Sequence, residues 1–121
     1  MKRPNNMSDL QALTEKIRKF RDERDWLQFH NHKDVALSLV LEATEVLEHF
    51  QWKSPEEVKV HAKAHQAELS DELADVAIYL LELADNMDID LSKAIDTKMK
   101  KNALKYPVEK AKGKHTKYNK L

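Results

Sequence analysis

The sequence predicts an all-α fold, an antiparallel four-helix-bundle-like subunit with one extra short helix. Apolar residues recur every three or four positions along most of the 121 residues, which is the spacing of one helix face. No segment alternates apolar and polar residues in the manner of a half-buried strand. The only glycine, Gly113, lies near the C-terminus, so hairpin turns that depend on glycine are nearly excluded.

The first helix is predicted over about residues 9–25, where apolar side chains repeat with helical spacing. Ser8 or Asp9 can provide its N-cap, because a short polar side chain there accepts a hydrogen bond from the first turn. Residues 1–8 are expected to form a flexible N-terminus. Residues 26–33 show weaker periodicity and are interpreted as a connection.

The second helix is predicted over about residues 34–50. Besides its main apolar stripe it carries Val35, Leu37 and Leu41, so it is apolar on more than one side. A helix that is apolar nearly all round is buried nearly all round. In a chain this short we therefore expect a subunit interface to supply that burial, and the protein to be a homo-oligomer.

A helix start is predicted at Ser54, with Pro55 in the first helical position and Glu57 completing a capping box. The short helix that follows is expected to end near Ala64. A long helix is predicted next, over about residues 66–86, with apolar side chains along one face.

The last helix is predicted over about residues 91–105, capped by Asp90 and ended by Pro107. Residues 9–107 are thus expected to form one all-α domain with short loops. The remaining residues 108–121 are rich in lysine and poor in core residues. We expect this C-terminal tail to be mobile or docked on a partner subunit.

Composition excludes several classes of function. The 21 basic and 21 acidic residues give a net charge of zero, which argues against a nucleic-acid partner. The absence of cysteine excludes disulfides and thiolate metal sites, and the single glycine excludes a glycine-rich phosphate loop. No apolar run approaches the length of a membrane span, and no signal sequence is evident, so a cytoplasmic protein is expected.

Two acidic pairs are the strongest candidates for chemistry. Glu42 and Glu45 lie three residues apart on the second predicted helix, and Glu72 and Asp75 lie three apart on the long helix. Such spacing puts both carboxylates of a pair on one side of a helix. If the two helices pack together, the four carboxylates suit Mg²⁺, or Mn²⁺, better than Zn²⁺. The alternative is that each pair lies on a solvated helix face.

Basic and aromatic residues accompany these pairs. Lys98, Asn102 and the neighbours Lys105 and Tyr106 recur along one side of the last predicted helix and could contact a polyphosphate. A solvated lysine-rich face is the alternative interpretation.

The two tryptophans, Trp26 and Trp52, lie just outside predicted helices, where an indole can stack on a nucleobase or serve as a hydrophobic anchor. Tyr79 shares the side of the acidic pair on the long helix, and His30 lies near Trp26 in the sequence. The i, i+4 pair His61 and His65 is interpreted as surface histidines, and His32, His49 and His115 form no recognisable constellation.

The order of these features resembles the MazG-like all-α nucleoside triphosphate pyrophosphohydrolases, in particular the dCTP pyrophosphatase-like branch. Glu-x-x-Glu is followed after 26 residues by Glu-x-x-Asp. Five landmarks in order carry the resemblance: the two acidic motifs, residues 23–30, residues 50–52 and residues 98–107.

The resemblance implies Mg²⁺-dependent hydrolysis of a (deoxy)nucleoside triphosphate to the monophosphate and pyrophosphate, in dimers or tetramers with sites near subunit interfaces. It implies metal binding by the four acids, with Glu42 or Glu45 activating a water. It further implies phosphate or sugar contacts from Lys98, Asn102 and Tyr106, and a base pocket lined by Trp26, Trp52 and Tyr79. The branch has a histidine where this chain has Ile17, and often an arginine at Lys105, so base selectivity can differ.

Two alternatives remain open at this point. A related enzyme acting on dUTP or phosphoribosyl-ATP would use similar acidic helices with a different base pocket. A non-enzymatic helical module for protein association would use the carboxylates for solubility and the tryptophans as interface anchors.

Overall fold

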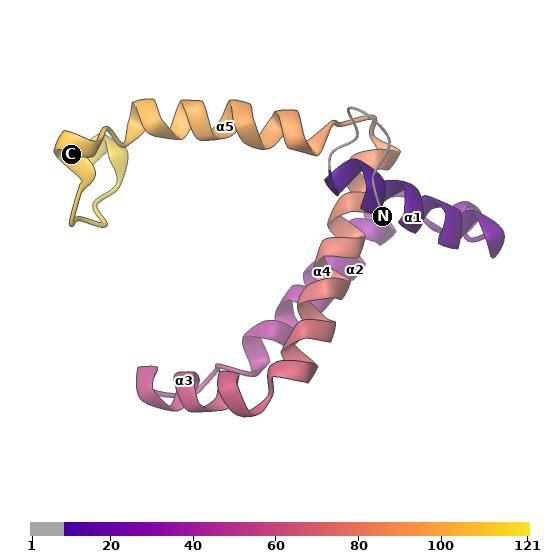
Figure 1. The fold of residues 1–121 in the computed structure, drawn as a ribbon, viewed down its shortest axis with the longest axis horizontal. Helices are drawn as coiled ribbons and strands as arrows, with labels where there is room; N and C mark the ends of the chain where they lie inside the picture. Colours follow the sequence, from indigo (N-terminus) through magenta and orange to yellow (C-terminus); the bar gives the residue numbers. More distant parts are fainter. Residues whose placement is uncertain (1–8) are drawn as a thin grey trace. The chain divides into compact units, whose positions relative to one another are not determined.

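The computed structural model describes residues 9–121, and every regular element in that range is helical (Figure 1). The expectations for residues 1–8, including Ser8 as a cap, lie outside the described residues. The chain divides into two compact units, one ending at Ile89 and the other running from Asp90 to Leu121. The predicted all-α class is confirmed, whereas the bundle arrangement and the single domain over residues 9–107 stay predictions.

The first unit is built on two antiparallel helices, α2 and α4. The start of α2 meets the end of α4, where the Asn86 side-chain amide donates to the His30 carbonyl at 3.4 Å. The end of α2 meets the first half of α4, where His49 lies 2.6 Å from Glu72. The elements of this unit are α1 (Asp9–Glu23), the 3₁₀ turn η1 (Leu27–Phe29), α2 (His32–Glu48), α3 (Pro55–Ala64) and α4 (Gln66–Asn86).

Both α1 and α3 contact α4, near its opposite ends (Figure 1). The buried apolar side chains among the described residues are few and come from α2 and α4: Val35, Leu69, Leu81 and Ala84. The hydrophobic core therefore lies along the α2–α4 seam, and it is small.

Local signals set most helix boundaries. Ser54 and Glu57 form the predicted capping box, with both reciprocal hydrogen bonds present, and α4 has the predicted bounds. The first helix ends at Glu23 rather than Asp25, because Asp25 takes a positive φ of 55° that closes the helix. The second helix begins two residues earlier than predicted, because Asn31 caps it by accepting from the Asp34 amide.

The second unit contains α5 (Leu91–Lys105), α6 (Val108–Ala111) and the 3₁₀ turn η2 (Tyr118–Lys120). As predicted, Asp90 caps α5 by accepting from the Lys93 amide at 3.1 Å. The tail is not extended, because Tyr118 packs edge-on against Tyr106 at 6.1 Å and receives the Lys105 ammonium over its ring at 4.8 Å. It thus folds back on the end of its own helix.

Within residues 9–121, none of the helices combines the length and the apolar character needed to cross a membrane.

Candidate functional site

The four acidic residues of the two motifs come together between α2 and α4. The pKa of Glu42 is raised, first by desolvation and then by the charge of Glu45 and a side-chain hydrogen bond with it. The charges of Asp75 and Glu72 on α4 raise it further. The antiparallel packing of the two helices therefore places both predicted pairs within electrostatic reach of each other, as the sequence predicts.

Glu72 is the most enclosed of these acids. Its Oε2 atom is buried and is the only such side-chain atom in the described residues that has no hydrogen-bonding partner. His49 Nε2 lies 2.6 Å from this oxygen, but out of line for a hydrogen bond. An unsatisfied buried carboxylate oxygen costs free energy. A bound ligand, or a small rotation of the side chain toward a donor, would remove that cost.

His49 belongs to a cluster of three histidines that the sequence did not predict. Its Nδ1 lies 2.7 Å from His61 Nε2, and the His61 ring stacks on His65 with centroids 4.0 Å apart. All three are half-buried, so His61 and His65 are less exposed than surface histidines would be. Burial, followed by the nearby His65, lowers the pKa of His61. The i, i+4 spacing could predict that His61 and His65 lie close together. His49 joins them only because α3 folds back against the end of α2.

The donor set fits a hard divalent cation in its chemistry. Four crowded carboxylates and an unsatisfied carboxylate oxygen are relieved by an ion that prefers oxygen ligands. Within residues 9–121, no three His, Asp or Glu side chains are arranged as a ready-made metal site. The carboxylates would therefore have to rotate toward one another to share an ion.

Both tryptophans lie in loops of the first unit and expose their rings. Trp52 follows α2, has a φ of 67° and is 92% exposed, so it anchors no core of this chain. A non-glycine residue held at positive φ is uncommon and often marks a functional position. Trp26 is 42% exposed and packs edge-on against Phe20 at 5.8 Å. Each indole thus keeps surface that a planar ligand could cover.

Tyr79 and His30, the other predicted base contacts, are both half-buried. Tyr79 lies one turn beyond Asp75 on α4. The His30 ring lies 6.1 Å from the Trp26 ring, and its Nδ1 is 2.6 Å from Glu82 Oε2. Only Nε2 of His30 is therefore left to meet a ligand.

The predicted phosphate and sugar contacts belong to the second unit, with Lys98 in the middle of α5 and Asn102, Lys105 and Tyr106 at its end. Lys98, Lys105 and Tyr106 are exposed, and Asn102 is half-buried. The i, i+4 spacing of Lys98 and Asn102 places them on one side of the helix, as predicted. Their contact with a phosphate stays a prediction.

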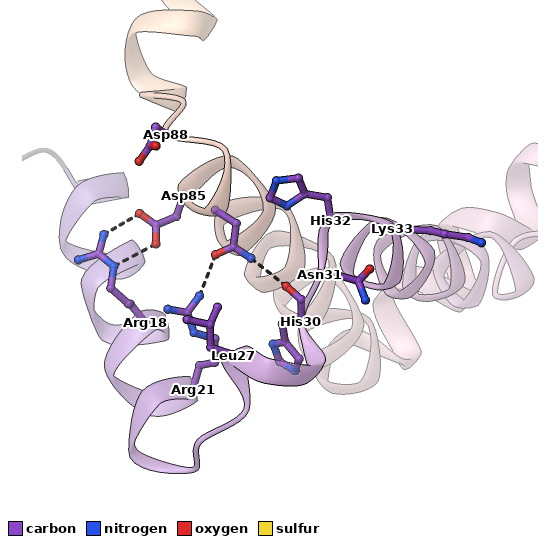
Figure 2. A pocket seen from close by; sticks show the side chains of 10 residues that line it. Arg18, Arg21, Leu27, His30, Asn31, His32, Lys33, Asp85 and Asp88 are labelled. Carbon is purple, nitrogen blue, oxygen red and sulfur yellow. Dashed lines mark hydrogen bonds and ion pairs between the residues drawn. The ribbon is translucent and has the colours of Figure 1, made fainter.

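A pocket of about 680 Å³ opens elsewhere in the first unit, between α1, η1, the start of α2 and the end of α4. Figure 2 shows Arg18 bound to Asp85 through two hydrogen bonds, of 2.6 and 3.0 Å, on one side of it. None of the four acids lines this pocket. We therefore place the candidate site at the carboxylates, where the charges conflict, rather than at this hollow.

The chain is similar to proteins of one known family. Residues 37–121 match the MazG-like family. The chain is 43% identical over 104 residues to dCTP pyrophosphatase 1 of Rattus norvegicus and 40% identical to that of Homo sapiens, in each case over 84% of this chain and 61% of the relative. It therefore spans about three fifths of the length of these curated relatives.

A solved structure is also similar. A pyrophosphatase from Archaeoglobus fulgidus superposes with a TM-score of 0.79 at 39% sequence identity, covering 88% of this chain and 99% of that one. The family match includes both acidic motifs, which the fold brings together between α2 and α4. The chain belongs to the MazG-like family.

Proposed function

We propose that the protein is a nucleoside triphosphate pyrophosphohydrolase that clears unwanted nucleotides, with dCTP or a related deoxynucleotide as substrate. The observation that carries the proposal is the convergence of Glu42, Glu45, Glu72 and Asp75 between α2 and α4. The names of the similar proteins, dCTP pyrophosphatase 1 in mammals and a pyrophosphatase in an archaeon, support the same chemistry.

The four acids would hold Mg²⁺, or Mn²⁺ in its place. The ion would neutralise charge on the triphosphate and on the leaving pyrophosphate. Glu42 or Glu45 would take a proton from a water whose oxygen bonds to the α-phosphorus, while the bond from that phosphorus to the bridging oxygen breaks.

The remaining predicted residues would bind the rest of the nucleotide. Trp26, Trp52, Tyr79 and His30 would line the base, supported by the exposed indoles described above. Lys98, Asn102, Lys105 and Tyr106 would contact the phosphates and sugar, supported by their recurrence along the second half of α5 and its C-cap.

We also propose that the protein works as a homo-oligomer, a tetramer rather than a dimer, in the cytoplasm. The support is the second helix, whose Leu37, Val40, Leu41 and Leu47 are between 50% and 62% exposed in the isolated chain. Contiguous apolar surface of this kind is typical of subunit interfaces.

The test is release of pyrophosphate from a panel of canonical and modified (d)NTPs, with Mg²⁺ and with EDTA. We expect Mg²⁺-dependent release from one or a few of them, and none in EDTA. Release from dUTP alone, or from phosphoribosyl-ATP alone, would replace the proposed substrate. A folded protein that releases nothing and gains no thermal stability from Mg²⁺ with nucleotide would favour the association-module alternative.

A further inference from the structure

Glu82 is a buried carboxylate on α4 that takes no part in the proposed chemistry. It is only 4% exposed. Its Oε2 atom lies 2.6 Å from His30 Nδ1 and 3.8 Å from Arg21 Nη1. A buried charge is tolerated only when it is paired, so Glu82 requires both neighbours to stay in place.

Arg21 is the second buried charge and ties the end of α1 to the same point. It is 5% exposed, and its Nη1 donates to Asn86 Oδ1 at 2.8 Å. The Asn86 amide in turn donates to the His30 carbonyl at 3.4 Å. Figure 2 shows these two hydrogen bonds as dashed lines that lead from Arg21 to the backbone of His30. The ring of His30 is thus fixed by Glu82, and its backbone is fixed by Asn86.

The segment enclosed by these contacts carries Trp26. Its backbone amide donates to the Arg21 carbonyl at 3.1 Å, directly after the left-handed turn at Asp25. Its ring packs against Phe20 on one side and lies 6.1 Å from the His30 ring on the other. Both ends of this short segment are therefore anchored to α4, the His30 end by Glu82 and Asn86, and the Arg21 end by Asn86 and the ion pair with Glu82.

We propose that Glu82 is a positioning residue for the nucleobase, which fixes the ring of Trp26 by holding Arg21 and His30 against α4. The proposal rests on the proposed function, because it takes Trp26 as a base contact. A ring held in one orientation loses little freedom when it binds a base. Loosening it should weaken substrate binding, and so raise KM, with a smaller effect on kcat.

A purely structural role makes a different prediction. Arg18 and Asp85 also join α1 to α4, through an ion pair of 2.6 Å that contacts neither His30 nor Trp26. If Glu82 served only to hold α1 against α4, loss of the Glu82 contacts and loss of the Arg18–Asp85 ion pair would change KM and kcat in the same way. Asp85→Asn is therefore the matched control for Glu82→Gln, a substitution that keeps the shape of the side chain.

The first measurement is the KM for the best substrate of the panel. We expect Glu82→Gln to raise KM about tenfold (~1.4 kcal/mol) with kcat changed much less, and Asp85→Asn to leave both unchanged. The rise should vanish when Glu82→Gln is made in a Trp26→Phe background, because the effect passes through the indole. An unchanged KM, or a rise that is the same in both backgrounds, would overturn the proposal.

The second measurement needs no activity. In a Trp52→Phe background Trp26 is the only tryptophan, and acrylamide quenching reports its exposure. We expect Glu82→Gln to increase quenching and Asp85→Asn to leave it unchanged; equal quenching in both would contradict the positioning role.

If the wild type hydrolyses no nucleotide, the proposed function fails, while quenching still decides whether Glu82 fixes Trp26. Should Glu82→Gln lose its helical circular dichroism, Asn86→Ala replaces it. This variant removes the contacts of Asn86 with Arg21 and His30. We expect it to raise KM and to increase the quenching of Trp26, as stated for Glu82→Gln.

Discussion

Glu42 lies within the electrostatic reach of the three other acids of the site. Its neighbours on both helices are acidic, and its pKa is raised by desolvation first and by those charges next. A carboxylate in this position is disfavoured in its charged form unless a cation lies among the group. Removal of one negative charge from the cluster should therefore increase the stability of the metal-free protein. The same change should lower the rate of a metal-dependent reaction.

The first prediction concerns Glu45→Gln and Asp75→Asn. Each should lower Mg²⁺-dependent pyrophosphate release by about 100-fold or more, since loss of a carboxylate ligand or base removes that much catalysis. Each should also remove the rise in Tm that Mg²⁺ with nucleotide gives the wild type. The metal-free Tm should stay equal or rise, because like-charge repulsion falls.

Glu15→Gln is the control, because Glu15 is an exposed acid on α1 outside the cluster. It should leave both readouts unchanged. Full activity in Glu45→Gln or Asp75→Asn would show that those carboxylates have no part in the chemistry.

Sequence reasoning succeeded for residues whose signal is local. The two carboxylate pairs could be found because i, i+3 spacing fixes their shared helix side before any packing is known. The histidine cluster could not, because His49 and His61 meet only after α3 folds back against the end of α2. Glu82 was missed for the same reason, since it lies 52 residues from its partner His30.

At the scale of helices, α1 is held to α4 by a link that depends on pH. The hydrogen bonds from Arg18, followed by its charge, hold the pKa of Asp85 below its usual range, although desolvation opposes them. A carboxyl whose pKa is lower in the folded state stabilises the fold above its unfolded pKa, near 3.8. That contribution is lost as the pH falls through the folded pKa.

The second prediction follows for Asp85→Asn. At pH 7 it should lower the free energy of unfolding by about 0.5 kcal/mol, a small value because the Arg18 side chain is 44% exposed and solvent screens the pair. Urea denaturation at pH 7 and pH 3 measures the difference from the wild type. The gap should be smaller at pH 3, which lies below the unfolded pKa, and a gap of equal size at both pH values would contradict the ion-pair interpretation.

The third prediction concerns the start of α3. Ser54 Oγ accepts from the Glu57 amide at 3.2 Å, and Glu57 Oε1 accepts from the Ser54 amide at 3.1 Å. Ser54→Ala removes the N-cap acceptor and should cost about 1 kcal/mol of stability. Urea denaturation followed by circular dichroism measures this cost. Ser70→Ala, within the exposed face of α4, is the control and should be neutral or slightly stabilising.

The helix boundaries show what local sequence can and cannot predict. Caps at Ser54 and Asp90 were correct because a cap is a contact within four residues. The end of α1 was two residues too late, because periodicity does not reveal the left-handed turn at Asp25. The turn of the tail onto Tyr106 was also missed, since it requires Tyr118 to return over 12 residues of sequence.

At the scale of the whole molecule, buried and exposed apolar surface are out of balance. The buried apolar side chains among the described residues number only four, Val35, Leu69, Leu81 and Ala84. Small cores of this kind rarely stabilise a chain alone, and association is one common remedy. The sequence predicted this surplus from the all-round apolar second helix, but the periodicity of one chain says nothing about how many copies share the surface.

The last prediction tests whether a subunit interface buries the exposed apolar surface of α2. Replacing Leu37 and Leu41 by glutamate puts two charges on the exposed face of α2, where a subunit interface would have to bury them at high cost. The wild type should have a solution mass of four times 14.1 kDa, and the double variant should fall toward 14.1 kDa. Light scattering coupled to gel filtration measures both.

Val60→Glu on α3 is the control, because Val60 is equally apolar and exposed but lies outside that face. It should keep the wild-type mass. If the proposed sites form at subunit interfaces, the double variant should also lose hydrolysis while its circular dichroism shows folded helices. A wild type that already migrates as a monomer would refute the interface and leave the apolar face of α2 without its expected partner.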